Sequence, residues 1–196
     1  KPYEGLRISE IAEKTGKHPV DAMLDIAVGT GLKAEFFVTA GNTANLQHMQ
    51  EIIDDPAVTF GISDGGAHTR FLTAGRYPTE TLTTYVREHN MLSLEEAHWK
   101  LSALPAAMAG FIGRGQLKVG APADILVYDY ENLEVLPAEI AHDLPGGEWR
   151  RIQRARGYSY ILINGEVTIE NDEQTNVYPG ALLRHGSARA VSHQKA

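Results

Sequence analysis

Apolar residues recur at helical spacing in several segments of the first 111 residues, and each repeat predicts a helix. Ser9 is the expected N-cap and Gly16 the stop signal of the first helix, and Pro19 suits the first position of the second. Ser93 and Glu96 form a capping box ahead of another helix. The predicted helices cover residues 8–16, 20–28, 44–53, 79–88, 94–104 and 106–111. Met23, Leu24, Ala27 and Val28 share one face of the second helix.

Two short apolar runs in the same half of the chain predict strands. Residues 35–40 are rich in aromatic and β-branched side chains, and residues 57–62 form a second such run. The helix between them favours a parallel strand–helix–strand unit. The second run stops at Ser63-Asp64-Gly65-Gly66, and an acid followed by glycines after a strand is how many α/β enzymes present a catalytic carboxylate. Asp-Gly is also an ordinary turn pair, so the motif alone leaves both interpretations open.

The pattern changes after residue 112. Turn-forming residues fill 115–124, residues 125–128 predict a strand, and residues 160–169 predict a hairpin around Asn164-Gly165, the preferred type I′ pair. The polar segment 144–151 predicts a loop, and residues 187–196 predict a frayed tail. We therefore expect two domains, residues 1–112 and 113–186.

Composition narrows the function classes. The chain has 196 residues, no cysteine and a formal net charge of −7, which together argue against a nucleic-acid partner and exclude disulfides, thiolate metal sites and a Cys nucleophile. No apolar run approaches the roughly 20 residues of a membrane span. No apolar segment of a signal peptide follows Lys1, so we expect a cytoplasmic protein with no membrane partner. The absence of an initiator Met suggests a piece of a longer protein.

Three motifs in a fixed order carry a family resemblance. They are GISDGG at 61–66, SLEEAHWKLSALPA at 93–106 and GRGQLKVGAPADILV at 113–127. Together they resemble the carboxyl-terminal part of the amidohydrolase superfamily, in particular its N-acyl-D-amino-acid deacylase branch. The resemblance implies an α/β fold: the end of a metal-dependent (β/α)8 TIM-type barrel with strands of a small β-sandwich. By this likeness, residues 36–40 and 58–62 would be the seventh and eighth barrel strands.

The same resemblance assigns roles to three residues. Asp64 would stand at the metal centre, accept a proton from a zinc-bound water and return it to the leaving amine. His68 and Arg70 follow closely and would contact the small-molecule substrate, because a guanidinium pairs with a carboxylate through two hydrogen bonds. Members of this branch often carry His-Pro-Arg, whereas this chain has His68-Thr69-Arg70, which leaves the substrate class open.

The family's other metal ligands have no counterpart in the sequence. The chain has no His-X-His, and its eight histidines are scattered. We therefore expect zinc to be bound mostly by residues of a longer parent protein, and we expect this chain alone to lack hydrolase activity.

Two alternatives remain beside metal-dependent hydrolysis of an N-acyl-D-amino acid. One is cyclic-amide hydrolysis of the hydantoinase or dihydroorotase kind. The other is a non-catalytic scaffold, in which exposed barrel edges at 36–40 and 58–62 would favour homo-oligomers. The basic cluster Arg150, Arg151, Arg154 and Arg156 is either a solvated or interdomain face or a lid over an anionic substrate.

Overall fold

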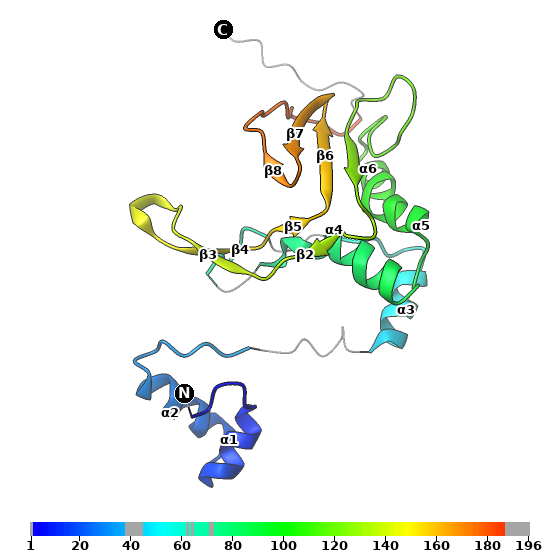
Figure 1. Cartoon of the computed structure of the whole chain (residues 1–196). Coiled ribbons are helices and arrows are strands. Elements are labelled where there is room, and N and C mark those ends of the chain that lie inside the picture. Colours follow the sequence, from blue (N-terminus) through cyan, green and yellow to red (C-terminus); the bar gives the residue numbers. More distant parts are fainter. Residues whose placement is uncertain (1, 38–44, 62, 64, 71–72, 187–196) are drawn as a thin grey trace. The chain divides into compact units, whose positions relative to one another are not determined.

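The structure, a computed structural model, describes residues 2–37, 45–61, 63, 65–70 and 73–186 (Figure 1). The chain divides into two compact units, Lys1–Asn45 and Leu46–Ala196. No helix in the described residues is both long and apolar enough to cross a membrane. The predicted tail, residues 187–196, lies outside the described residues.

The first unit is a pair of helices, α1 (Ile8–Thr15) and α2 (Pro19–Gly29). Gly16 ends α1 in the left-handed conformation at φ 66°, as predicted. The predicted N-cap Ser9 is wrong, since the helix is capped at Arg7. The backbone N–H of Arg7 donates to a Glu10 carboxylate oxygen over 2.7 Å, and this bond starts the helix earlier.

A small apolar interior holds these two helices together. Ile11, Ala12 and Ala22 are buried, with Ile26 packed against them. The predicted apolar face of α2 is partly exposed, and Val28 retains 74% of its accessible surface. One neighbouring helix covers only one stripe of α2, and that stripe is the Ala22 side.

Helices form the first half of the second unit. They are α3 (Leu46–Asp54), η1 (Ala74–Arg76), α4 (Tyr77–Glu80), η2 (Thr81–Glu88), α5 (Leu94–His98), η3 (Trp99–Ala103) and α6 (Leu104–Met108). The capping box is confirmed: the Glu96 N–H donates to Ser93 Oγ over 3.2 Å, and the Ser93 N–H donates to the Glu96 carboxylate over 2.9 Å. The predicted break at Pro105 is absent, because α5, η3 and α6 follow one another directly from 94 to 108.

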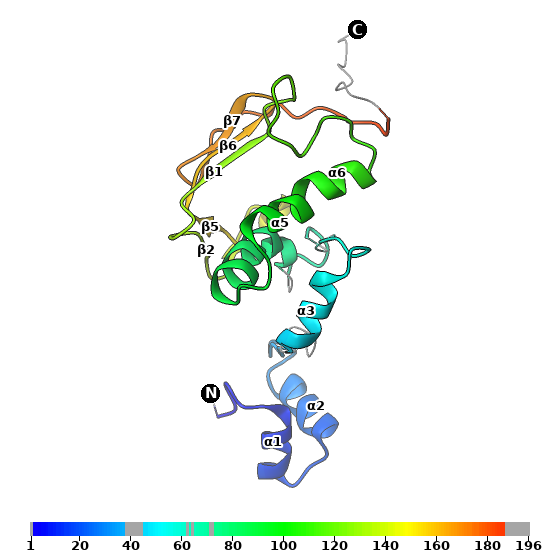
Figure 2. The same cartoon turned by 90° about the vertical axis from the view of Figure 1, so that its right-hand side faces the viewer.

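An antiparallel sheet forms the second half of this unit. Its order is β1-β6-β7-β8, with β1 (Ile125–Tyr128), β6 (Tyr158–Ile163), β7 (Glu166–Glu170) and β8 (Glu173–Gln174). Asn164 and Gly165 turn the β6–β7 hairpin at φ 50° and 86°, so the predicted type I′ turn is confirmed. Helices α5 and α6 lie on one side of this sheet (Figure 2).

A two-stranded ribbon, residues 134–156, extends from the sheet (Figure 1). It pairs β2 (Glu134–Val135) with β5 (Ala155–Arg156), and β3 (Glu139–Ala141) with β4 (Arg150–Ile152), around the 3-10 turn η4 (Pro145–Gly147). The predicted loop 144–151 is therefore wrong at its end, since Arg150 and Arg151 belong to β4. The strands of this ribbon lack the apolar alternation that would have predicted them.

The core lies where the helices meet the sheet. Leu82, Ala97 and Leu133 are its most buried apolar side chains. Gly157 passes so close to this core that a Cβ on it would lie 2.9 Å from Leu133 Cα, and its φ of +112° is one that other residues rarely adopt.

Four polar side chains cross the same boundary. His98 Nε2 from α5 lies 2.6 Å from the Tyr128 hydroxyl of β1, and the Tyr158 hydroxyl of β6 lies 2.8 Å from Thr79 Oγ1 of α4. The tyrosine rings are 6.1 Å apart. Hydrogen bonds and ring packing thus fix the helices against the sheet.

The two predicted barrel strands differ from the structure. Their described parts, residues 35–37 and 58–61, form no strand, and 38–40 and 62 lie outside the described residues. Every strand pair in the described part is antiparallel, so the predicted parallel pair is not formed there. A parallel strand exists only through its ladder with neighbours, and these segments find no such neighbour within the described chain. The mixed helix-and-strand architecture is as predicted.

Candidate functional site

The predicted catalytic residue, Asp64, lies outside the described residues, and its role stays a prediction. The residues on either side of it are described. The Gly65 N–H donates to Ser63 Oγ over 3.1 Å, which tightens the turn at this point. We call the segment that follows, residues 65–70, the site loop.

His68 is exposed on the site loop and has a left-handed backbone with φ 50°. Among non-glycine residues, histidine is one of the few types that adopt this conformation with some frequency. Its exposed position places the His68 side chain at the surface of the loop.

Arg70, the second predicted substrate contact, pairs with Glu148 at the tip of the ribbon. Both side chains are about half exposed, at 53% and 57%. The Arg70 guanidinium carbon lies 5.3 Å from the centre of the Trp149 ring, a cation–π contact. Arg151 approaches the same ring, at 6.0 Å.

Three further bonds tie the ribbon to the residues around the site loop. The Arg151 N–H donates to the Thr69 carbonyl over 2.7 Å, and Arg151 Nε donates to the Arg70 carbonyl over 2.9 Å. Thr73 Oγ1 donates to the Gln153 side-chain oxygen over 2.7 Å. The ribbon therefore runs along the site loop and holds its backbone. Sequence reasoning missed this contact, because its partners are about 80 residues apart and no local pattern joins them.

The basic cluster is largely neutralised by carboxylates of the ribbon itself. Arg150 donates two hydrogen bonds to Asp143, at 2.8 and 2.6 Å, and this guanidinium lowers the pKa of the Asp143 carboxyl. Arg154 pairs with Glu139 at 3.0 Å, and Arg156 pairs with Glu134 at 2.5 Å. This pairing favours the solvated face over a lid for an anionic substrate.

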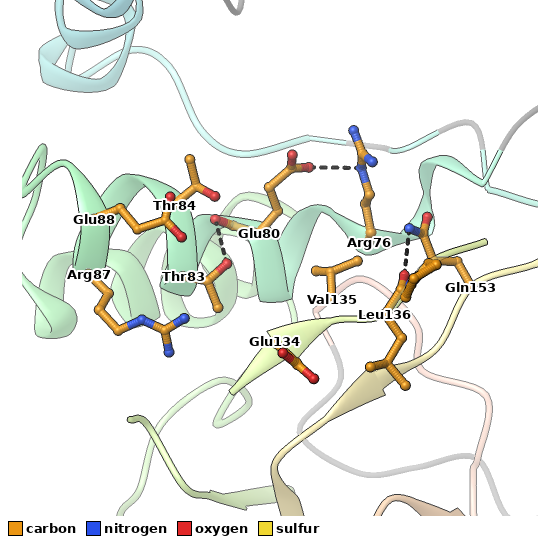
Figure 3. Close-up of a pocket in the computed structure, with 11 residues that line it drawn as sticks. Arg76, Glu80, Thr83, Thr84, Arg87, Glu88, Glu134, Val135, Leu136 and Gln153 are labelled. Carbon is orange, nitrogen blue, oxygen red and sulfur yellow. Dashed lines mark hydrogen bonds and ion pairs between the residues drawn. The ribbon is translucent and has the colours of Figure 1, made fainter. Parts of the chain in front are cut away.

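A cavity of about 400 Å³ opens between η2 and the base of the ribbon (Figure 3). Two pairs of its lining groups bond to each other. Arg76 pairs with Glu80 at 3.1 Å, and the Gln153 amide donates to the Leu136 carbonyl over 2.9 Å. Glu88 also lines the cavity, whereas His68 and Arg70 do not.

Metal-binding groups do not converge in the described part of the chain. No three His, Asp or Glu side chains among those residues come close enough to hold an ion.

Comparison with known proteins matches most of this chain, including the site loop, to one protein family. The model of a family described as the amidohydrolase family matches residues 4–169. An N-acyl-D-glutamate deacylase of Alcaligenes xylosoxydans xylosoxydans is 33% identical over 112 residues, which are 57% of this chain and 21% of the relative. An N-acyl-D-aspartate deacylase of the same organism is 28% identical over 188 residues, 93% of this chain and 36% of the relative.

Solved structures of related enzymes are also similar to this chain. The crystal structure of a D-aminoacylase matches with a TM-score of 0.56 at 25% identity, over 94% of this chain and 36% of that one. A second D-aminoacylase structure, with a TM-score of 0.55 at 26% identity over the same shares, was solved to study the binuclear metal centre of that enzyme. The chain spans only about a fifth to a third of the length of the curated relatives it matches.

Proposed function

Because this chain belongs to the amidohydrolase family, we propose that the protein carrying it hydrolyses the amide C–N bond of an N-acyl-D-amino acid. The observation that carries the proposal is the family match over residues 4–169, which includes both the Ser63-Asp64-Gly65 motif and Arg70. The deacylases of N-acyl-D-glutamate and N-acyl-D-aspartate among its relatives support the substrate class.

Arg70 is the group proposed to recognise the substrate. An N-acyl amino acid carries one carboxylate beside its amide, and a guanidinium binds a carboxylate in a planar, two-bonded geometry. Arg70 is half exposed and is oriented by Trp149 and the ribbon, so a ligand can reach it. His68, exposed on the same loop, is proposed as a second contact.

Asp64 is proposed to move the proton. In the hydrolysis, a water oxygen adds to the amide carbonyl carbon, the C–N bond breaks, and one water proton ends on the leaving nitrogen. A carboxylate beside the reacting water can accept that proton and then deliver it to the amine, so that no proton is gained or lost overall.

Zinc is part of the proposal for the whole protein only. The D-aminoacylase among the solved relatives has a binuclear metal centre. The described residues of this chain do not fit a metal by themselves, since no three ligand groups converge among them, so no chemical step is assigned to the metal here. For the same reason we expect no acylase turnover from this polypeptide on its own.

Assembly with other chains is a second candidate role. Residues 35–37 and 58–61 form no strand pair in the described structure, and Phe37 retains 87% of its accessible surface. Extended segments of this kind can pair with strands of another copy. Light scattering tests this role: a dimer or larger species supports it, and a monomer at high concentration contradicts it.

A substrate panel tests the proposed activity. The protein, as isolated from its source, is assayed with N-acetyl-D-glutamate, N-acetyl-D-aspartate, their L-enantiomers, hydantoin and dihydroorotate. We expect release of the free D-amino acids and no opening of the cyclic amides. Turnover of the cyclic amides alone would replace the proposal with the cyclic-amide alternative, and no turnover of any of them would favour the scaffold.

A further inference from the structure

Glu148 differs from the other paired acids of the ribbon. Glu134, Glu139 and Asp143 each pair with an arginine of the ribbon itself. Among the ion pairs in the described part of the chain, the pair of Glu148 is the one that leaves the ribbon, and it ends on Arg70 of the site loop.

The Arg70 guanidinium has a ring contact besides its ion pair, and the ribbon holds the backbone of Arg70. The indole of Trp149 lies against Arg70, and Arg151 bonds the carbonyls of Thr69 and Arg70 on the same loop. Glu148 is 57% exposed and follows the Gly146-Gly147 turn, where both glycines have positive φ. Because it is more than half exposed, the Glu148 carboxylate has room to turn into solvent, while the Trp149 ring still contacts Arg70.

We propose that Glu148 is an internal counter-anion of Arg70, which the carboxylate of a bound ligand displaces. The proposal rests on the proposed function only for the identity of that ligand, an N-acyl amino acid. Glu148 then acts as a specificity-determining residue, since an uncharged ligand cannot replace it at the guanidinium.

The expected size of the effect follows from the exposure of the pair. Exposed ion pairs contribute about 0.2–1 kcal/mol, which corresponds to an internal pairing constant of about 1.4–5. A ligand that competes with such a pair binds about two- to six-fold more weakly than it would to an Arg70 without a partner.

Trp149 supplies the readout. These 196 residues contain two tryptophans, so Trp99→Phe leaves Trp149 as the single indole emitter among them. N-Acetyl-D-glutamate is titrated into this background, with the N-acetyl-D-glutamate diamide, which has no carboxylate, as the control ligand. We expect a saturable change in emission with the acid and none with the diamide.

Variants then separate the roles. Glu148→Gln should lower the apparent Kd for the acid about two- to six-fold, whereas Glu148→Asp should leave it nearer the original value. Arg70→Met should abolish the response. The matched control is Glu139→Gln, an equally exposed ribbon acid paired with Arg154, and it should leave the Kd unchanged.

Three results would overturn the inference: an unchanged or weaker affinity in Glu148→Gln, an equal gain in Glu139→Gln, or no saturable response in any variant. Binding is measured here without turnover. If the protein hydrolyses none of the substrates but Glu148→Gln still binds the acid more tightly, the proposed activity is contradicted and this inference is still supported.

Discussion

The second unit contains two regions held by different forces. The body, made of helices α3–α6 and the sheet β1-β6-β7-β8, is organised around side chains that retain almost no exposed surface, such as Leu82 at 2% and Leu133 at 0%. The ribbon has pairs of exposed charges instead, and its Ile140 keeps 56% of its surface. Apolar burial stabilises the body, whereas the ribbon depends on ion pairs that contribute about 0–1 kcal/mol each.

This difference explains where ligand contacts can change without loss of the fold. Contacts of small individual free energy form and break easily, while a close-packed core resists displacement. The site loop lies against the ribbon, so its Arg70 can exchange partners without disturbing the core. Substitutions in the core, at the boundary between helices and sheet, and in the ribbon test this difference between the two regions.

The largest effect is expected in the core. Leu133→Ala should lower the free energy of unfolding by about 2–5 kcal/mol, because it removes a fully buried side chain and leaves a cavity. Urea denaturation followed by circular dichroism measures the loss. Leu126→Ala is the control, since Leu126 is 45% exposed on β1 and should cost far less. Equal losses in the two variants would contradict the described core.

An intermediate effect is expected from pH at the boundary between helices and sheet. Burial lowers the pKa of His98 below its ordinary value of about 6.5, and the nearby Glu95 carboxylate opposes this only in part. The unfolded chain therefore binds a proton at His98 more readily than the folded chain. The contribution of neutral His98 to the free energy of unfolding is therefore fully present above about pH 6.5, and it is lost as the pH drops below that value.

Unfolding by urea between pH 7.5 and 5 measures this dependence. His98→Gln keeps a polar group beside the Tyr128 hydroxyl and removes the titration, so its stability should fall less over the same interval. A His142→Gln control should behave like the original chain, because His142 is exposed on the ribbon. A parallel fall in His98→Gln would exclude His98 as the source.

The smallest effect is expected in the ribbon. A double-mutant cycle of Arg154→Met and Glu139→Gln should give a coupling free energy of about 0.2–1 kcal/mol, since both side chains are more than half exposed. Added salt should reduce the coupling toward zero, because it screens exposed charges. A coupling above about 2 kcal/mol that persists in 1 M salt would show that the charges of the ribbon are shielded from solvent, as the core of the body is.

Local signals made much of the helices and the β6–β7 hairpin predictable. Ser93 with Glu96, Asn164 with Gly165, and Gly16 each form their structure through bonds or backbone angles within a few residues, and all three predictions are confirmed. Ser9 failed because a competing bond from Arg7 to Glu10 starts the helix two residues earlier. Val28 lies on the predicted helix but is exposed, because helical spacing does not say which side a neighbour covers.

The ribbon and the predicted barrel strands depend on partners far along the chain. Glu134 and Arg156 stand opposite each other across 21 intervening residues, so their polar sequence resembles a loop until the pair forms. Residues 35–37 and 58–61 have the composition of strands but form no ladder in the described structure. Composition predicts the ability to form a strand, and the neighbour decides whether one forms.

The candidate site divides in the same way. His68 and Arg70 could be proposed from their spacing after the Ser63-Asp64-Gly65 motif, because the loop itself brings them near it. Glu148 and Trp149 could not, since they reach Arg70 from 78 and 79 positions later through tertiary contacts alone.

The most direct test of the proposed hydrolysis is the turnover of N-acetyl-D-glutamate by the protein isolated from its source, compared with its Asp64→Asn variant. Asparagine keeps the size of the side chain and cannot carry the proton. We expect kcat to fall by about 10²–10⁴-fold, the usual contribution of a general acid–base group, while carboxylate binding at Arg70 persists. A kcat within two-fold of the original would contradict the role of Asp64 and, with it, the proposed mechanism.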